Sequence, residues 1–184
     1  MKGHIFNLLE DFISQVSDED TLYEILDQCS FDTSSSFVRT ENYPDEHLLE
    51  IVNHTIAKLG ITMETAQFEF GKWLYPKLIK LLPSEFTDFP HPAHVLKNLD
   101  ELHKVELTKL YPDAKPPTFQ YEVVNETQAC LYYCSPRRMF DLVNGVLQGM
   151  AEHYDVGIQT KVIANWQGDE NRARFELTYN QAPH

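Results

Sequence analysis

The chain has 184 residues, of which 42% are hydrophobic, and this is enough for a substantial core in one domain of one or two lobes. Its formal net charge of −13 argues against nucleic acid and against anionic membranes as partners, because their phosphate groups would repel the protein.

The three cysteines, Cys29, Cys130 and Cys134, are an odd number without regular spacing, so we expect no disulfide framework. No CxxC pair is present, and a structural zinc site therefore has no obvious set of ligands. The N-terminus lacks a signal-peptide pattern, and no apolar run is long enough to span a bilayer. These features predict a cytoplasmic protein, which we take to be a monomer.

Helical periodicity runs through the first part of the chain. Predicted helices cover residues 5–16, 21–29, 44–60 and 93–110, and a further helix runs from residue 62 past residue 73. Pro76 is expected to kink or break this last helix. Residues 30–43 and 83–92 are predicted to be loops, because the first is rich in polar turn residues and the second in proline.

The pattern changes to two-residue alternation after Pro112. Residues 119–124 and 129–133 are predicted to form a hairpin, 136–154 a helix, and 158–164 and 173–179 two further strands. The sequence therefore predicts an α+β fold. We expect a helical lobe of about residues 1–111, and then a lobe of about residues 112–184 with a four-stranded antiparallel sheet in the order β-β-α-β-β.

The most distinctive motif is Tyr133-Cys134-Ser135-Pro136-Arg137, which places hydrogen-bonding side chains at every second position. In an extended segment, Tyr133, Ser135 and Arg137 would point to one side. Two hydroxyls and a guanidinium suit an anion with several oxygens, such as a carboxylate. A structural role is also open, in which Ser135 caps a helix that begins at Pro136. The two interpretations are compatible.

His103 lies in the middle of an apolar stripe on the predicted helix 93–110. The leucines that surround it at helical spacing are Leu96, Leu99, Leu107 and Leu110. Because burial of a bare imidazole is costly, such a histidine needs a polar partner or a metal. Two interpretations follow: a core histidine bonded to a carbonyl, or an axial ligand of haem iron.

Together with the start of the chain, these features resemble the haem nitric-oxide/oxygen-binding (H-NOX) family, which also supplies the sensor domain of soluble guanylate cyclase. The matching segments are residues 1–10, 103–110, 116–117 and 133–139. The resemblance implies haem b, protoporphyrin IX iron, between the lobes. His103 would be the axial iron ligand, and the motif residues Tyr133, Ser135 and Arg137 would bind the propionates. It also implies that Ile5 and Pro117 press on the porphyrin from opposite sides, with Pro116 as the alternative to Pro117.

The resemblance also bears on which gas is bound. Family members that hold O2 donate a hydrogen bond from a tyrosine on the helix after the motif, and the matching residue here is Leu142. The other residues expected to line the gas pocket are apolar as well: Ile5, Leu9, Leu74, Leu78 and Val146. This implies binding of NO and CO and exclusion of O2. Trp73, Tyr75 or Tyr132 would supply a donor only if a helix were misplaced.

The family's mechanism implies a non-enzymatic NO sensor. NO weakens the bond opposite to it, so His103 is released and the signal passes to a separate protein, in bacteria a histidine kinase or a cyclic-di-GMP enzyme. Three alternatives are weighed against this: an O2 or redox sensor of the same family, a cofactor-free interaction domain, and a hydrolase that uses Ser135 or Cys134. The hydrolase is disfavoured because the sequence has no nucleophile elbow or ordered triad motif.

Overall fold

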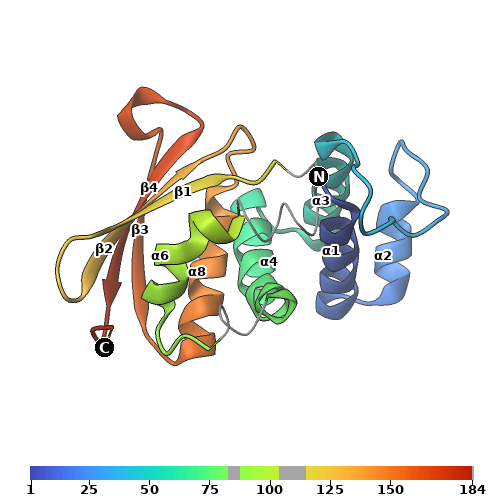
Figure 1. Cartoon of the computed structure of the whole chain (residues 1–184). Coiled ribbons are helices and arrows are strands. Elements are labelled where there is room, and N and C mark those ends of the chain that lie inside the picture. The colour runs from blue at the N-terminus through green and yellow to red at the C-terminus, as the bar shows by residue number, and fades with distance from the viewer. Residues whose placement is uncertain (83–87, 104–114, 184) are drawn as a thin grey trace. The chain divides into compact units, whose positions relative to one another are not determined.

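The structure, a computed structural model, describes residues 1–82, 88–103 and 115–183. It has the predicted α+β fold, with helices and a four-stranded antiparallel sheet (Figure 1). The chain divides into two compact units, Met1–Phe70 and Gly71–His184, and the boundary falls within helix α4 (Met63–Leu78). Helix α6 (Pro92–Glu101) therefore belongs with the sheet, whereas the sequence pattern grouped it with the N-terminal helices.

The first unit contains α1 (Gly3–Val16), α2 (Glu19–Leu26) and α3 (Asp45–Leu59). Asp18 begins α2 by accepting a hydrogen bond from the Thr21 amide at 2.7 Å, which explains the predicted break after α1. Helix α3 ends at Gly60, whose φ of 68° lies in the left-handed region that glycine tolerates best. The buried apolar residues of this unit include Phe6, Leu9, Ile13, Ile25, Phe37, Leu48 and Ile51.

The second unit is built on strands β1 (Thr118–Val123), β2 (Gln128–Cys134), β3 (Ile158–Ala164) and β4 (Arg172–Tyr179). Their order in the sheet is β1-β2-β4-β3, and all neighbours are antiparallel. Helix α8 (Phe140–Tyr154) connects the two hairpins, so the predicted β-β-α-β-β order is confirmed. The buried side chains of β4 alternate as the sequence predicted: Ala173, Phe175, Leu177 and Tyr179.

Helices α6 and α8 lie against one face of this sheet (Figure 1). Their apolar side chains, such as Leu96 and Leu147, form a common core with strand residues such as Leu131. Pro76 stays inside α4, and the chain then tightens into a 3-10 turn at Ile79–Leu81. Among the described residues, none of the helices combines the length and the apolar character that crossing a membrane requires.

Three helix boundaries differ from the prediction by three residues or more, and the first is the end of α2, which lies at Leu26 and not at residue 29. Helix α8 begins at Phe140 and not at Pro136, because Arg138 has a φ of 50° and a left-handed residue cannot continue a right-handed helix. Helix α6 ends at Glu101, and the chain passes through a wider π-type turn at residues 102–103. Leu107 and Leu110, half of the stripe predicted around His103, lie outside the described residues.

Candidate functional site

The end of β2 positions the first two residues of the Tyr-x-Ser-x-Arg motif. Tyr133 lies opposite Phe119 on β1 and Ala173 on β4, and Ser135 follows directly after the strand. The Ser135 amide donates a hydrogen bond to the Asn171 carbonyl at 2.9 Å. Tyr133 and Ser135 are each 3% exposed, so the sheet holds both in a buried position.

The chain turns after Ser135, and the motif is therefore not extended over its whole length. The Arg138 amide donates to the Ser135 carbonyl at 3.1 Å, and the Ser135 Oγ accepts a hydrogen bond from the Arg137 amide at 3.3 Å. The hydroxyl thus closes this turn. The prediction that Ser135 caps the following helix is wrong, because the N-cap of α8 is Met139, which makes no side-chain capping bond.

The side chains of Tyr133, Ser135 and Arg137 act on one another. Burial raises the pKa of Tyr133, and hydrogen bonds with the Ser135 side chain and the Met139 backbone, together with the charge of Arg137, oppose that rise. The Arg137 Nη1 donates to the Lys115 carbonyl at 2.8 Å. The structure therefore brings two hydroxyls and a positive guanidinium together, an arrangement suited to carboxylates.

His103 lies just beyond α6 and is half-buried. Burial lowers the pKa of His103 to about 4, opposed by the Asp100 carboxylate and by a hydrogen bond with the Pro117 backbone. Because proline has no amide proton, the ring donates this bond to the Pro117 carbonyl. The imidazole is therefore neutral at neutral pH, the state in which it binds metals. Its Nδ1 is buried and has no hydrogen-bond partner among the described residues.

A row of aromatic rings connects His103 with the motif. The His103 ring lies 5.3 Å from that of Phe119 and Phe119 lies 5.4 Å from Tyr133, both measured between ring centroids. Tyr133 in turn makes an edge contact with Phe140 at 5.6 Å. Neither Phe119 nor Phe140 carries a motif or spacing that marks it as a site residue. Alternation placed Phe119 on a strand, but only the β1–β2 register sets it opposite Tyr133.

Helices α4 and α8 approach each other closely at two glycines. A Cβ on Gly71 would lie 2.2 Å from the Leu142 carbonyl oxygen, and a Cβ on Gly149 would lie 2.5 Å from the Lys72 carbonyl oxygen. Four of the residues predicted to line the gas pocket lie on these two helices: Leu74 and Leu78 on α4, and Leu142 and Val146 on α8. Leu74 is buried and the other three are half-buried.

The tyrosines considered as alternative donors are engaged elsewhere. The Tyr75 hydroxyl donates to the Tyr154 hydroxyl at 3.4 Å, and the Tyr132 hydroxyl donates to Glu122 Oε2 at 3.0 Å. Ile5 and Leu9 belong to α1 in the first unit, where Ile5 is half-buried and Leu9 is buried. Their roles at the cofactor stay predictions.

The residues of the second unit fit a metal-centred cofactor that carries carboxylates. The buried Nδ1 of His103 lacks the partner that buried polar atoms normally have, and metal coordination gives a ring nitrogen such a partner. A carbonyl partner such as Pro117 also orients many metal-binding histidines. Tyr133, Ser135 and Arg137 offer the donors that propionate groups require. This set is suited to haem.

Comparison with known proteins agrees with this chemistry. The Haem-NO-binding (HNOB) family matches residues 2–162. An H-NOX protein from S. oneidensis in the Fe(II)NO ligation state is 24% identical, with a TM-score of 0.86 over 98% of this chain and 100% of that one. The I5F mutant of T. Tengcongensis H-NOX is 20% identical, with a TM-score of 0.89 over 100% of both chains. The unliganded Fe(II) H-NOX protein from K. algicida is 19% identical, with a TM-score of 0.87 over 100% of this chain and 99% of that one. No curated protein matches the chain. At these identities, the structural matches show the fold.

Proposed function

The chain belongs to the Haem-NO-binding family, the H-NOX domains, and on that premise we propose that it is a haem-based sensor of NO. It binds NO and CO at ferrous haem b, excludes O2, and signals to a separate protein when His103 is released. The observation that carries this proposal is the neutral imidazole of His103, whose buried Nδ1 has no hydrogen-bond partner among the described residues.

The residues of the motif hold the haem by its propionates. Two propionates are two carboxylates, and a hydrogen bond from Arg137 to one of them contributes about 1.5–3 kcal/mol. The buried hydroxyls of Tyr133 and Ser135 supply further donors. Ile5 and Pro117 would be the residues that contact the porphyrin from its two sides.

The apolar side chains of Leu9, Leu74, Leu78, Leu142 and Val146 select the gas. Bound O2 carries partial negative charge and gains from a hydrogen-bond donor, whereas NO on ferrous haem needs little such help. Leu142 offers no donor, and the hydroxyls of Tyr75 and Tyr132 are bonded to Tyr154 and Glu122. The pocket therefore favours NO and CO.

His103 is the moving part of the switch. Haem would supply a ferrous iron that binds the gas, and His103 would be the protein group that holds this iron and lets go of it when NO binds. The free imidazole of His103 is neutral at neutral pH in the position described, because burial lowers its pKa to about 4. Its bond to the Pro117 carbonyl couples the ring to β1, which begins at Thr118. A shift of His103 would therefore move Pro117 and the start of β1. A protein with two such conformations can transmit the change to a partner that binds one of them better.

The partner is a cytoplasmic histidine kinase or cyclic-di-GMP enzyme, and the sensor itself is a non-catalytic monomer. The strongly acidic surface that follows from a net charge of −13 favours a basic docking surface on that partner.

The test is the absorption spectrum of the purified protein, reduced without air and then exposed to NO or to O2. We expect bound haem, a change of spectrum with NO, and none with O2. His103→Ala should abolish haem coordination, and added imidazole should restore it. His94→Ala is the matched control: His94 lies on α6 and also has a buried Nδ1 with no partner in the described part of the chain. Equal effects of both substitutions would contradict the assignment of His103.

A further inference from the structure

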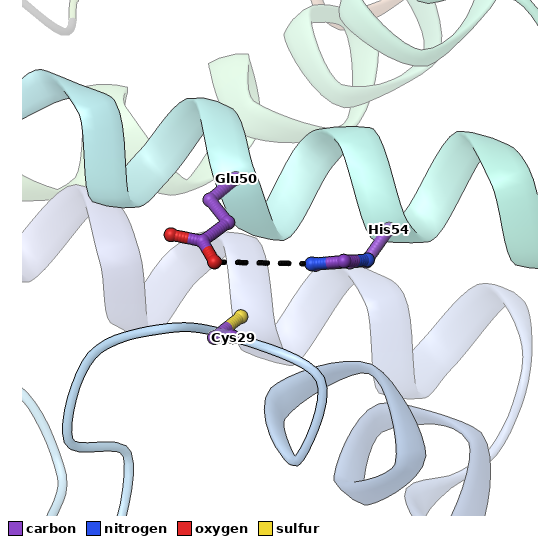
Figure 2. Close-up of side chains that lie close together, drawn as sticks. All are labelled: Cys29, Glu50 and His54. Carbon is purple, nitrogen blue, oxygen red and sulfur yellow. Dashed lines mark ion pairs between the residues drawn. The ribbon is translucent and has the colours of Figure 1, made fainter.

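A cluster of three potential metal ligands lies in the first unit and involves none of the residues assigned to haem. Cys29 follows α2, whereas Glu50 and His54 lie one turn apart on α3 (Figure 2). The thiol sulfur, a carboxylate oxygen and a ring nitrogen all lie within 4.8 Å of one another, and all three residues are half-buried. We propose that Cys29, Glu50 and His54 bind a zinc ion.

The carboxylate and imidazole on α3 lie close to the spacing found in a zinc site, and the Cys29 thiol lies within 4.8 Å of both. Residues four apart on a helix share one face, and Glu50 Oε1 lies 3.9 Å from His54 Nε2. A tetrahedral zinc ion with bonds of about 2.0–2.3 Å separates its ligand atoms by about 3.3–3.8 Å, and an oxygen–nitrogen pair by about 3.4 Å. A contraction of about 0.5 Å, within reach of side-chain rotation, would therefore bring carboxylate and imidazole to coordination distance. In Figure 2 the Cys29 side chain points toward the same space from the segment after α2.

Ser30 holds the carboxylate in place. Its amide donates to Glu50 Oε1 at 2.5 Å and its hydroxyl donates to Glu50 Oε2 at 2.9 Å. The backbone hydrogen bond from Ser30 is the main reason why the pKa of Glu50 lies below its usual value, so the group is a carboxylate at neutral pH. Because Ser30 is the neighbour of Cys29, the contact that orients Glu50 also positions the thiol. In metal sites, the residues that bind the metal are typically oriented by further hydrogen-bonding groups, as Ser30 orients Glu50 here.

The chemistry of the three ligands favours zinc over other ions. Zinc accepts sulfur, nitrogen and oxygen ligands, whereas Mg²⁺ and Ca²⁺ prefer oxygen alone and iron–sulfur clusters need several thiolates. One thiolate, one carboxylate and one neutral imidazole balance the charge of a divalent ion. A water molecule completes the tetrahedron, as in other zinc sites with three protein ligands.

Zinc binding must displace a proton from Cys29. Burial and the neighbouring Glu50 carboxylate raise the pKa of Cys29 to about 11, so the free thiol is protonated at neutral pH. The zinc–sulfur bond forms as the sulfur–hydrogen bond breaks, and the proton goes to the buffer. This release distinguishes coordination by Cys29 from loose binding of zinc to carboxylates.

The experiment is calorimetric titration of the haem-loaded, chelator-treated protein with Zn²⁺ in two buffers of different ionisation enthalpy. We expect one zinc ion per chain and release of about one proton. Cys29→Ser should abolish the proton release, and both Cys29→Ser and His54→Ala should weaken binding by about 100-fold or more. Cys130→Ser and Cys134→Ser, which remove thiols on β2, are the controls and should change neither quantity.

Absence of stoichiometric binding, or wild-type affinity in Cys29→Ser and His54→Ala, would overturn the proposal. A measurement on the unsubstituted protein keeps the test independent of folding defects. When ¹¹³Cd²⁺ is bound in place of zinc, its NMR resonance should show the chemical shift that one thiolate ligand causes. A resonance typical of oxygen and nitrogen ligands alone would also overturn the proposal. The three ligands include none of the residues assigned to haem, so failure of the proposed gas sensing would leave the expected zinc stoichiometry and proton release unchanged.

Discussion

Replacing Arg137 with alanine tests whether the Tyr-x-Ser-x-Arg motif holds haem by its propionates. The guanidinium acts on Tyr133 and donates to the Lys115 carbonyl at 2.8 Å, so it is held beside the buried hydroxyls. A charge-assisted hydrogen bond contributes about 1.5–3 kcal/mol, and the half-buried position of Arg137 favours the lower part of this range. Since 1.4 kcal/mol is a factor of ten, we expect haem to dissociate about 10–30-fold faster.

The assay is transfer of haem to an excess of apomyoglobin, followed by absorbance. Arg138→Ala is the matched control, because it removes the same charge from the next residue, which is exposed and pairs with Glu170 at 2.9 Å. An exposed pair of this kind contributes about 1 kcal/mol or less, so Arg138→Ala should change the rate by about fivefold at most. Equal acceleration in the two variants, or none in Arg137→Ala, would refute the assignment of Arg137 to a propionate.

Three further substitutions test other parts of the molecule. Leu142→Tyr adds a hydroxyl donor on α8, so its reduced form should give an O2 spectrum in air, whereas Leu142→Phe, with the ring but no hydroxyl, should not. Burial, with a smaller contribution from Asp11, raises the pKa of Glu10 from 4.5 to about 6. As the pH rises, the unfolded chain therefore loses this proton before the folded protein does. The free energy of unfolding falls by at most about 2 kcal/mol as the pH passes from 4.5 to about 6. Glu10→Gln should accordingly raise the melting temperature at neutral pH and leave it unchanged below pH 4.5. An equal effect at the two pH values would exclude the raised pKa of Glu10 as the cause. Gly149→Ala places a Cβ 2.5 Å from the Lys72 carbonyl oxygen and should lower the urea unfolding free energy by about 1–2 kcal/mol, despite the better helix propensity of alanine. A gain in stability would mean that α4 and α8 have room to separate.

Periodicity was sufficient to predict the sheet lobe. Burial alternates along β4 as the apolar residues alternate in the sequence, and the stretches between strands carry clear turn residues. The start of α8 was mispredicted because proline at the first helical position is a common signal, whereas the left-handed Arg138 has no such signature. Local sequence could not reveal that a turn would separate Ser135 from the helix.

The contacts that sequence reasoning missed all depend on pairing between distant segments. Phe119 reaches both His103 and Tyr133 only through the register of β1 on β2. The i, i+4 pair of Glu50 and His54 is visible in the sequence, but the approach of Cys29 to it depends on how the chain folds after α2. Cys29 has no CxxC spacing, so no local pattern joins it to that pair.

The topology of the sheet has a consequence for the order of folding. The β1–β2 and β3–β4 hairpins join neighbours in the chain, whereas β2 can pair with β4 only after α8 and β3 have been accommodated. Closing this long connection carries the larger entropic cost, so we expect it to be the slower step. The bond from the Ser135 amide to the Asn171 carbonyl belongs to that junction. The propionate site is therefore completed late, and haem should be captured by a folded sheet. Haem added during refolding should leave the rate of strand formation unchanged, and faster strand formation would instead identify haem as part of the folding nucleus.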